Sequence, residues 1–278
     1  MTRQQFLSDE QARSGNRKLW DEITPVHFRS YGVEHFLAGK RWLPKEILNE
    51  VGEVRELSLL HLQCHFGLDS LAWVRQGAQV TGVDFSPVAI VSARKLARRA
   101  NLSADFICSD VYDLPGNLTG QFDLVFTSIG VLCWLHDLTT WAEMIAHFLK
   151  SGGIFYIMDA HPLLYTFDEE GKWTFQLPYF HNENPYVWDD ESPDYMDPTY
   201  IPQSPSYEWQ WAVSDIINAV IGAGLELEFF HEFEALSEPI YPDMSQRPDG
   251  LFAFGGTPVA LPIVFSLRAR RKFSGESK

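Results

Sequence analysis

The chain has 278 residues and a hydrophobic content of 45%, which suits one large α/β core with additions. Its formal net charge of −15 argues against nucleic-acid binding, since that binding relies on Lys and Arg to neutralise phosphates. The first residues lack the apolar segment of a signal peptide, and no apolar run reaches the length of a membrane span. We therefore expect a cytoplasmic protein that acts on a small molecule and contacts neither nucleic acid nor membrane.

The three cysteines, Cys64, Cys108 and Cys133, form neither a Cys-x-x-Cys pair nor an even-numbered set. They predict small buried side chains rather than a disulfide framework or a zinc site. His61 and His65 are four residues apart, but they flank the end of a predicted strand instead of sharing a helix face. We therefore expect no metal site.

The first 56 residues mix charged and aromatic side chains and carry too little apolar sequence for a core of their own. Pro44 precedes an expected helix over Lys45–Val51. Two or three helices are predicted here, covering a ligand site as an N-terminal lid. Packing of these helices on the outside of the sheet is the alternative.

Residues 57–164 alternate between short apolar runs and helical segments, which is typical of a parallel sheet with helices on both faces. The expected strands are Leu57–Leu62, Val80–Val83, Ala104–Cys108, Phe122–Thr127 and Ile154–Met158. The expected helices cover 68–76, 87–100 and 138–149, with Ser86 as the N-cap of the second. Asp84 closes the second strand, where an acid can bind ribose hydroxyls in nucleotide-binding units.

Residues 165–210 break this pattern with many prolines and a high density of aromatic and acidic side chains. The aromatic content argues against disorder, so an ordered substrate-side insertion is expected. Aromatic rings together with acids can form a cage for an amine or a planar cation. A small satellite core with solvated acids is the alternative.

Residues 211–278 are expected to complete the core. A helix is predicted over Trp211–Ala223, followed by strands over Leu225–Phe233 and Leu261–Ala269. Because no helical crossover separates these two strands, they predict an antiparallel pair at one edge of the sheet.

This set of features resembles the class I S-adenosylmethionine-dependent methyltransferases. It comprises the acid after the second strand, Ser109-Asp110 after the third, Phe-Asp-Leu-Val in the fourth and a Leu-Lys-Ser-Gly-Gly turn. The resemblance implies an α/β fold with a Rossmann-like, seven-stranded, mostly parallel sheet and an antiparallel terminal pair. It also implies S-adenosylmethionine as cofactor and methyl transfer to a nitrogen or oxygen atom of a small-molecule acceptor, by a monomer or homodimer.

The loop after the first strand departs from that family's Asp-x-Gly-x-Gly-x-Gly pattern. The corresponding residues are His61, Gln63, His65 and Gly67, so only the last glycine is kept. The stretch His-Leu-Gln-Cys-His-Phe-Gly, with Gly-Val-Leu-Cys-Trp-Leu at 130–135, resembles an uncharacterised bacterial subgroup of the family. The lost glycines leave open a non-catalytic cofactor-binding or regulatory protein, and they disfavour an NAD-dependent oxidoreductase, which needs Gly-x-Gly-x-x-Gly.

The resemblance implies a set of cofactor-binding residues: Gln63, Cys64, His65, Gly67, Asp84, Phe85, Ser86, Asp110, Val111, Thr127, Ser128 and Ile129. In this set Asp84 would bind the ribose, Asp110 the adenine amino group, and 127–129 the methionyl amine. A turn-capping role is the alternative for Asp110.

Four residues are expected at the acceptor: Tyr31, Trp134, His161 and Tyr165. His161 lies just past the fifth strand and is the candidate general base if the acceptor must lose a proton. A structural role, in packing or in hydrogen bonding to the backbone, is the alternative for His161.

Overall fold

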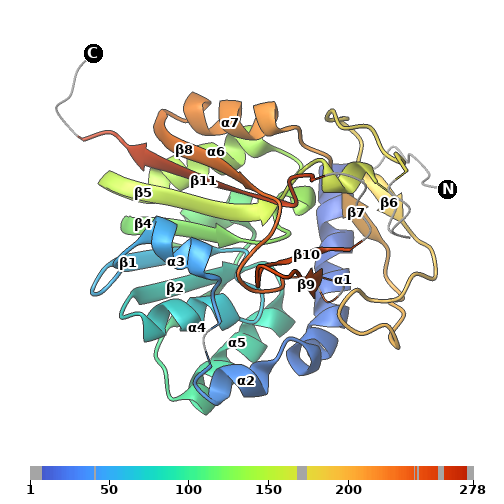
Figure 1. Ribbon diagram of the computed structural model, residues 1–278. Helices are drawn as coiled ribbons and strands as arrows, with labels where there is room; N and C mark the ends of the chain where they lie inside the picture. Colours follow the sequence, from blue (N-terminus) through green and yellow to red (C-terminus); the bar gives the residue numbers. More distant parts are fainter. Residues whose placement is uncertain are drawn as a thin grey trace.

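The computed structural model describes residues 8–40, 42–167, 174–240, 242, 244–255 and 260–273. The parts of the predicted lid and insertion that fall on 1–7, 41 and 168–173 lie outside the described residues. A seven-stranded sheet forms the centre of the molecule (Figure 1). Its strands are β1 (Ser58–Leu62), β2 (Gln79–Asp84), β3 (Asp105–Cys108), β4 (Phe122–Ser128), β5 (Leu149–Ala160), β8 (Leu225–Phe233) and β11 (Val264–Arg271).

The strand order is β3-β2-β1-β4-β5-β11-β8. The first five strands in this order pair in parallel, and β11 runs antiparallel to both β5 and β8. Parallel strands place their carboxyl ends at one edge, where ligands bind in such sheets. The predicted mostly parallel sheet with an antiparallel terminal pair is confirmed.

Helices cover both faces of the sheet (Figure 1). One face carries α3 (Lys45–Val51), α4 (Leu68–Arg75) and α5 (Pro87–Ala100), and the other carries α6 (Leu138–Phe148) and α7 (Val213–Gly222). Side chains alternate between the faces along each strand, so Leu59 and Phe126 join the first core while Leu60 and Val125 join the second. Both sides of the central strands are therefore apolar, as expected for a buried parallel sheet.

The predicted start of α5 is confirmed. The Ser86 side chain accepts a hydrogen bond from the Ala89 N–H at 3.0 Å, and Pro87 is the first helical residue. These residues fix where the chain leaves β2, and hence where Asp84 lies at the strand end.

The N-terminal segment forms α1 (Asp9–Ser30) and α2 (Val33–Leu37), and α1 crosses the carboxyl ends of the central strands (Figure 1). The insertion contributes β6 (Tyr186–Trp188) and β7 (Ser206–Glu208), which pair with each other. The Asn16 side chain on α1 donates to the Tyr207 carbonyl at 2.7 Å and accepts from its N–H at 2.8 Å. The described part of the insertion is thus ordered against α1.

Two features differ from the sequence prediction. Strand β5 begins directly after α6, where a turn was predicted over 150–153. Leu149 pairs with Phe122 and the next pair with β4 is Ile154 with Leu124, so residues 150–153 form a bulge within the strand. A short hairpin of β9 (Met244–Gln246) and β10 (Phe252–Phe254) was not predicted, since three-residue strands show no periodicity. Short 3₁₀ turns are η1 (Val111–Gly116), η2 (Leu132–Trp134) and η3 (Leu164–Thr166).

Among the described helices, none combines the length and the apolar character needed to cross a bilayer.

Candidate active site

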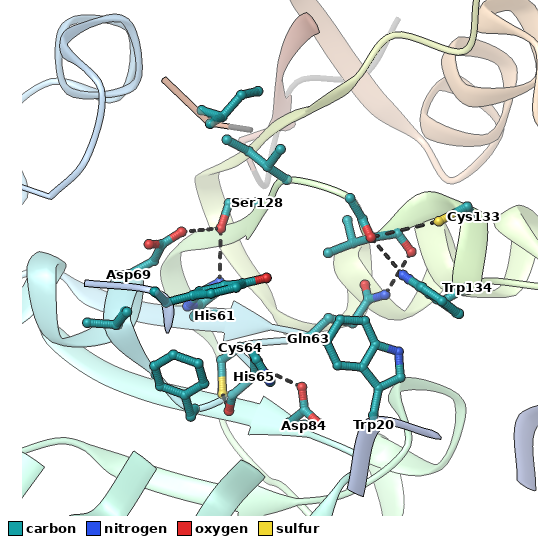
Figure 2. A pocket seen from close by; sticks show the side chains of 18 of the residues that line it. Trp20, His61, Gln63, Cys64, His65, Asp69, Asp84, Ser128, Cys133 and Trp134 are labelled. Atoms are coloured by element: carbon teal, nitrogen blue, oxygen red, sulfur yellow. Dashed lines mark hydrogen bonds between the residues drawn. The ribbon is translucent and has the colours of Figure 1, made fainter. Parts of the chain in front are cut away.

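A cavity of about 740 Å³ lies at the carboxyl ends of the central strands and is lined in part by residues of α1 (Figure 2). Its volume suits a ligand of nucleotide size. Most of the residues predicted for the site line it: Tyr31, Gln63, Cys64, His65, Gly67, Asp84, Phe85, Asp110, Val111, Ser128, Ile129, Trp134 and Tyr165. Residues far apart in the sequence are therefore brought together as predicted.

The loop between β1 and α4 keeps a glycine-like backbone without its glycines. Gln63 and His65 have φ of 53° and 51°, and Gly67 has φ of 78°. Such left-handed conformations are uncommon for residues with a Cβ. The Cys64 N–H donates to the Val83 carbonyl at 2.9 Å, which holds the loop against β2.

Gly67 is required for a second reason, which is close packing. A Cβ at this position would lie 2.7 Å from the Phe106 ring on β3 and 3.1 Å from Ala93 on α5. Gly67 also begins α4 as its N-cap. The one glycine kept from the family pattern is thus the one that neighbouring side chains enclose.

Asp84 is buried at the end of β2. Its carboxylate accepts hydrogen bonds from the His65 N–H at 2.8 Å and the Ser86 N–H at 2.9 Å. Burial, together with the nearby Asp21 carboxylate, raises the pKa of Asp84 to about 6, although these hydrogen bonds oppose the shift. Within the described chain, Asp84 has no ion-pair partner.

A polar network that the sequence did not reveal centres on Asp69, in the first turn of α4. Its carboxylate accepts from Trp42 Nε1 at 2.5 Å and from Ser128 Oγ at 2.6 Å (Figure 2). Ser128 Oγ lies 3.4 Å from His61 Nε2, and His61 Nδ1 lies 2.7 Å from Ser70 Oγ. Asp69, Ser128 and His61 all line the cavity.

Burial shifts the pKa values of two groups in this network. It lowers the pKa of His61 to about 3, so the ring is neutral near pH 7. Burial also raises the pKa of Asp69, and no described Lys or Arg neutralises it. An acid in the first turn of a helix is usually explained by the helix dipole, so Asp69 had no separate signal in the sequence.

Aromatic rings form one wall of the cavity. The Trp20 ring lies 5.0 Å from the His65 ring and 5.3 Å from the Trp134 ring, centroid to centroid, with edge-to-face geometry. The Tyr31 ring lies 5.7 Å from that of His65, and Tyr31 and Tyr195 form a hydrogen bond through their hydroxyls. Helix α1, the loop after β1 and the insertion therefore meet at this wall.

His27 and Asp194 form a second link between α1 and the insertion. His27 Nε2 lies 2.8 Å from Asp194 Oδ2, and both side chains are almost fully buried. Burial opposes ionisation of Asp194, but hydrogen bonds from His27 and from two backbone N–H groups lower its pKa overall. The carboxylate is thus held in its charged form beside the ring.

The loop after β4 is held by a buried acid, Asp159. Its carboxylate accepts hydrogen bonds from the backbone N–H groups of Gly130, Val131 and Leu132, the last at 3.0 Å. Several backbone donors on one carboxylate fix the path of this loop. The position of Trp134, whose Nε1 donates to the Gly130 carbonyl at 2.8 Å, follows from it.

Three predicted residues do not line the cavity. The Ser86 hydroxyl caps α5 and donates to Asp21 at 2.5 Å, and the Thr127 hydroxyl donates to the Leu62 carbonyl at 3.2 Å. His161 Nδ1 accepts from the Leu163 N–H at 3.1 Å, and its Nε2 lies 3.0 Å from Glu232. The backbone contact matches the structural alternative for His161, and its position gives no support to a role as base.

Asp110 shows its predicted alternative role and also lines the cavity. Its side chain caps η1 by accepting from the Tyr112 N–H at 3.1 Å, and it pairs with Arg13 of α1 at 3.0 Å. Within the described chain, no group of three or more His, Cys, Asp or Glu side chains is arranged to hold a metal ion.

Comparison with known proteins agrees with this geometry. A family model described as "Methyltransferase domain" matches residues 60–157. The ubiquinone biosynthesis O-methyltransferase of Xanthomonas oryzae pv. oryzae is 33% identical over 99 residues, which are 36% of this chain and 41% of the relative. The chain thus matches less than half the length of this curated relative.

Solved structures share the fold over about four fifths of this chain. An S-adenosylmethionine-dependent methyltransferase from Mesorhizobium loti superposes with a TM-score of 0.57 at 20% identity, over 81% of this chain and 96% of that one. Another, from Clostridium acetobutylicum, gives 0.53 at 14% identity, over 82% and 89%. Residues 60–157 therefore match a methyltransferase domain, within a chain whose fold is that of solved S-adenosylmethionine-dependent methyltransferases.

Proposed function

We propose that this protein is an S-adenosylmethionine-dependent methyltransferase that acts on a nitrogen or oxygen atom of a small molecule. The observation that carries the proposal is the pair of buried carboxylates, Asp84 and Asp69, at the cavity without a described cationic partner. A buried charge without a partner is costly, so such a cavity favours a ligand with positive charge. S-adenosylmethionine carries a sulfonium and an ammonium against one carboxylate, and fits that requirement.

The residues around the cavity match the parts of this cofactor. Asp84 would accept hydrogen bonds from the ribose hydroxyls, as acids after the second strand do in related folds. Asp110 and Val111 would meet the adenine, with Phe85 against its face, and Asp69 with Ser128 would bind the methionyl ammonium. When bound, S-adenosylmethionine supplies an electrophilic methyl group on a positively charged sulfur.

The protein would contribute alignment and exclusion of water. The acceptor's lone pair forms the new bond to the methyl carbon while the carbon–sulfur pair stays on sulfur, so the two substrates must be held in line. The loop at 130–134, fixed by Asp159, and the wall of Trp20 and Tyr31 would enclose the acceptor. If the acceptor is an O–H group, its proton leaves to water, since His161 does not reach the cavity.

The N-terminal lid and the insertion at 165–210 are proposed as the acceptor-side cover. Trp20, Tyr31 and Tyr195 line the cavity from these segments, and the His27–Asp194 pair joins the two. The name of the Xanthomonas oryzae relative supports an oxygen acceptor. A cytoplasmic monomer or homodimer remains part of the proposal.

Calorimetric titration with S-adenosylhomocysteine and an assay of labelled methyl transfer test the proposal together. The acceptors would be a panel of phenols, amines and carboxylic acids. We expect one binding site per chain and transfer to phenols or amines. Turnover on thiols alone, when these are added to the panel, would contradict the proposed nitrogen or oxygen acceptor, and binding without any transfer would favour a non-catalytic cofactor-binding protein.

A further inference from the structure

Gln63 occupies a position where the family pattern has glycine, and it combines two unfavourable features. Its backbone lies in the left-handed region, at φ 53°. Its side-chain oxygen Oε1 is buried and has no hydrogen-bond partner among the described residues. A residue that carries both backbone strain and an unsatisfied polar atom is a candidate for function, since neither feature stabilises the fold.

The orientation of the Gln63 amide is fixed. Its Nε2 donates to the Val131 carbonyl at 3.1 Å (Figure 2). A carbonyl can only accept, so the amide nitrogen must face Val131 and Oε1 must face away from it. Because Asp159 anchors the Val131 and Leu132 N–H groups, the Gln63 oxygen is held by a rigid chain of contacts.

The surroundings of Gln63 belong to the acceptor side of the cavity. Gln63 lines the cavity together with Trp20 and Trp134, and in Figure 2 its amide points toward the loop that carries Trp134. The family resemblance placed Gln63 among the cofactor residues, but the polar groups proposed for the cofactor have other partners, in Asp84, Asp110 and Asp69, which leaves Gln63 to the acceptor. Oε1 is therefore a hydrogen-bond acceptor left for the second substrate.

We propose that Gln63 binds the methyl acceptor, an inference that rests on the proposed function. The acceptor is a planar aromatic compound with a hydroxyl group that donates a hydrogen bond to Gln63 Oε1. The aromatic wall of Trp20, Tyr31 and Trp134 supplies stacking surface for such a ring. The amide oxygen accepts a hydrogen bond and takes no proton. An aromatic ligand without a donor leaves Oε1 unsatisfied and binds more weakly.

The test uses catechol and its donor-free analogue 1,2-dimethoxybenzene as probes. Each is titrated into the protein saturated with S-adenosylhomocysteine, with tryptophan fluorescence as the readout. Wild-type protein is expected to bind catechol at least fivefold more tightly than the dimethoxy analogue. In Gln63→Leu this preference is expected to disappear, while affinity for S-adenosylhomocysteine changes by less than threefold.

Gln121→Leu is the matched control. The Gln121 amide also donates to a backbone carbonyl, that of His147 at 3.2 Å, but it is exposed and does not line the cavity. Its substitution should leave both affinities unchanged. Gln63→Gly is the second variant, because glycine adopts the left-handed backbone freely. The variant protein should melt at no lower temperature than wild type, and it should lose the preference for catechol.

The possible outcomes separate this proposal from the proposed function. Equal affinity of wild-type protein for the two probes, or no binding of catechol, would overturn the role of Gln63 while leaving cofactor binding intact. A loss of S-adenosylhomocysteine affinity in Gln63→Leu would also overturn it, because Gln63 would then be a cofactor contact. Failure of wild-type protein to bind S-adenosylhomocysteine would instead contradict the proposed function.

Discussion

The backbone N–H of His65 donates a hydrogen bond to the Asp84 carboxylate at 2.8 Å. This contact joins the loop after β1 to the acid at the end of β2. It is made although His65 has a left-handed backbone and a large side chain. The imidazole lies among the rings of α1, and burial together with nearby His27 holds its pKa well below the usual range. The loop thus presents its backbone to the site while its neutral side chain contacts the lid.

The first prediction concerns the pH dependence of cofactor binding. With a pKa of about 6, Asp84 is charged at pH 7.5 and mostly protonated at pH 5. A charged carboxylate is the stronger hydrogen-bond acceptor, so affinity for S-adenosylhomocysteine should fall by about tenfold between these values. Calorimetry should show Asp84→Asn binding more weakly, with a flatter pH profile. An affinity in wild-type protein that rises toward pH 5 would contradict this assignment.

The same pKa predicts how stability changes with pH in the absence of ligand. The folded-state pKa of Asp84 lies above the value of about 3.9 expected when unfolded, so the folded protein binds this proton more tightly. The contribution of Asp84 should therefore become more favourable as pH falls from about 7 to 4. Urea unfolding across this range should show a smaller gain on acidification in Asp84→Asn than in wild type. Parallel pH profiles for the two proteins would count against a raised pKa.

The second acid, Asp69, should discriminate ligands by their amino-acid part. Asp69→Asn is expected to weaken S-adenosylhomocysteine binding by roughly 10- to 100-fold, the range for one hydrogen bond to a charged group. It should leave 5′-methylthioadenosine, which lacks the ammonium, almost unaffected. Asp123→Asn is the control, because Asp123 pairs with Lys150 at 2.8 Å and does not line the cavity. Equal losses for both ligands would show that Asp69 acts only on the fold.

Gly67 should tolerate substitution poorly. Gly67→Ala places a Cβ against the Phe106 ring and forces a positive φ, so a loss of roughly 2 kcal/mol or more in unfolding free energy is expected. Gly222→Ala is the contrast, because nothing lies within 4 Å of its added Cβ. That variant should be neutral or stabilising by up to about 1 kcal/mol, since alanine favours helix. Chemical denaturation measures both, and similar losses in the two variants would contradict the packing argument.

Thiol reactivity should distinguish the three cysteines. Cys64 and Cys133 are buried, and burial with nearby acids raises the pKa of both well above the usual range. Cys108 is exposed, so the prediction that all three cysteines are buried is wrong for it, although partial burial and Asp84 raise its pKa as well. We expect one thiol per folded chain to react with a chromogenic disulfide reagent, and three after denaturation. Reaction of the folded protein should disappear in Cys108→Ser. Fast reaction of Cys133 in folded protein would contradict its burial.

Much of the fold could be predicted because its sequence signals are local. The alternation of short strands and helices predicted a mostly parallel sheet, and Ser86 with Pro87 predicted where α5 begins. The short hairpin of β9 and β10 was not predicted, because strands of three residues show no periodicity, although Pro248-Asp249-Gly250 between them is a turn signal. The long helix α1 also lacked a clear signal, since its buried residues face both α5 and the insertion.

The site also contains some residues that could be predicted from the sequence and others that could not. Asp84 and Gly67 follow from their positions at the ends of elements, which sequence shows. Asp69 was missed because its partners Trp42 and Ser128 come from distant segments, and only the fold brings them together. His161 was favoured by its place after β5, yet its ring turns toward Leu163 and Glu232. Position along the chain therefore identified the strand ends, but not which side chains enter the cavity.

The central claim is that buried carboxylates make this cavity a site for a cationic cofactor. Titration of the protein with S-adenosylmethionine and with S-adenosylhomocysteine tests this claim most directly. Wild-type protein should bind both at one site per chain. Asp84→Asn and Asp69→Asn should each weaken binding at least tenfold, while Asp123→Asn should not. Absence of binding by wild-type protein, or unchanged affinity in both cavity variants, would contradict the account.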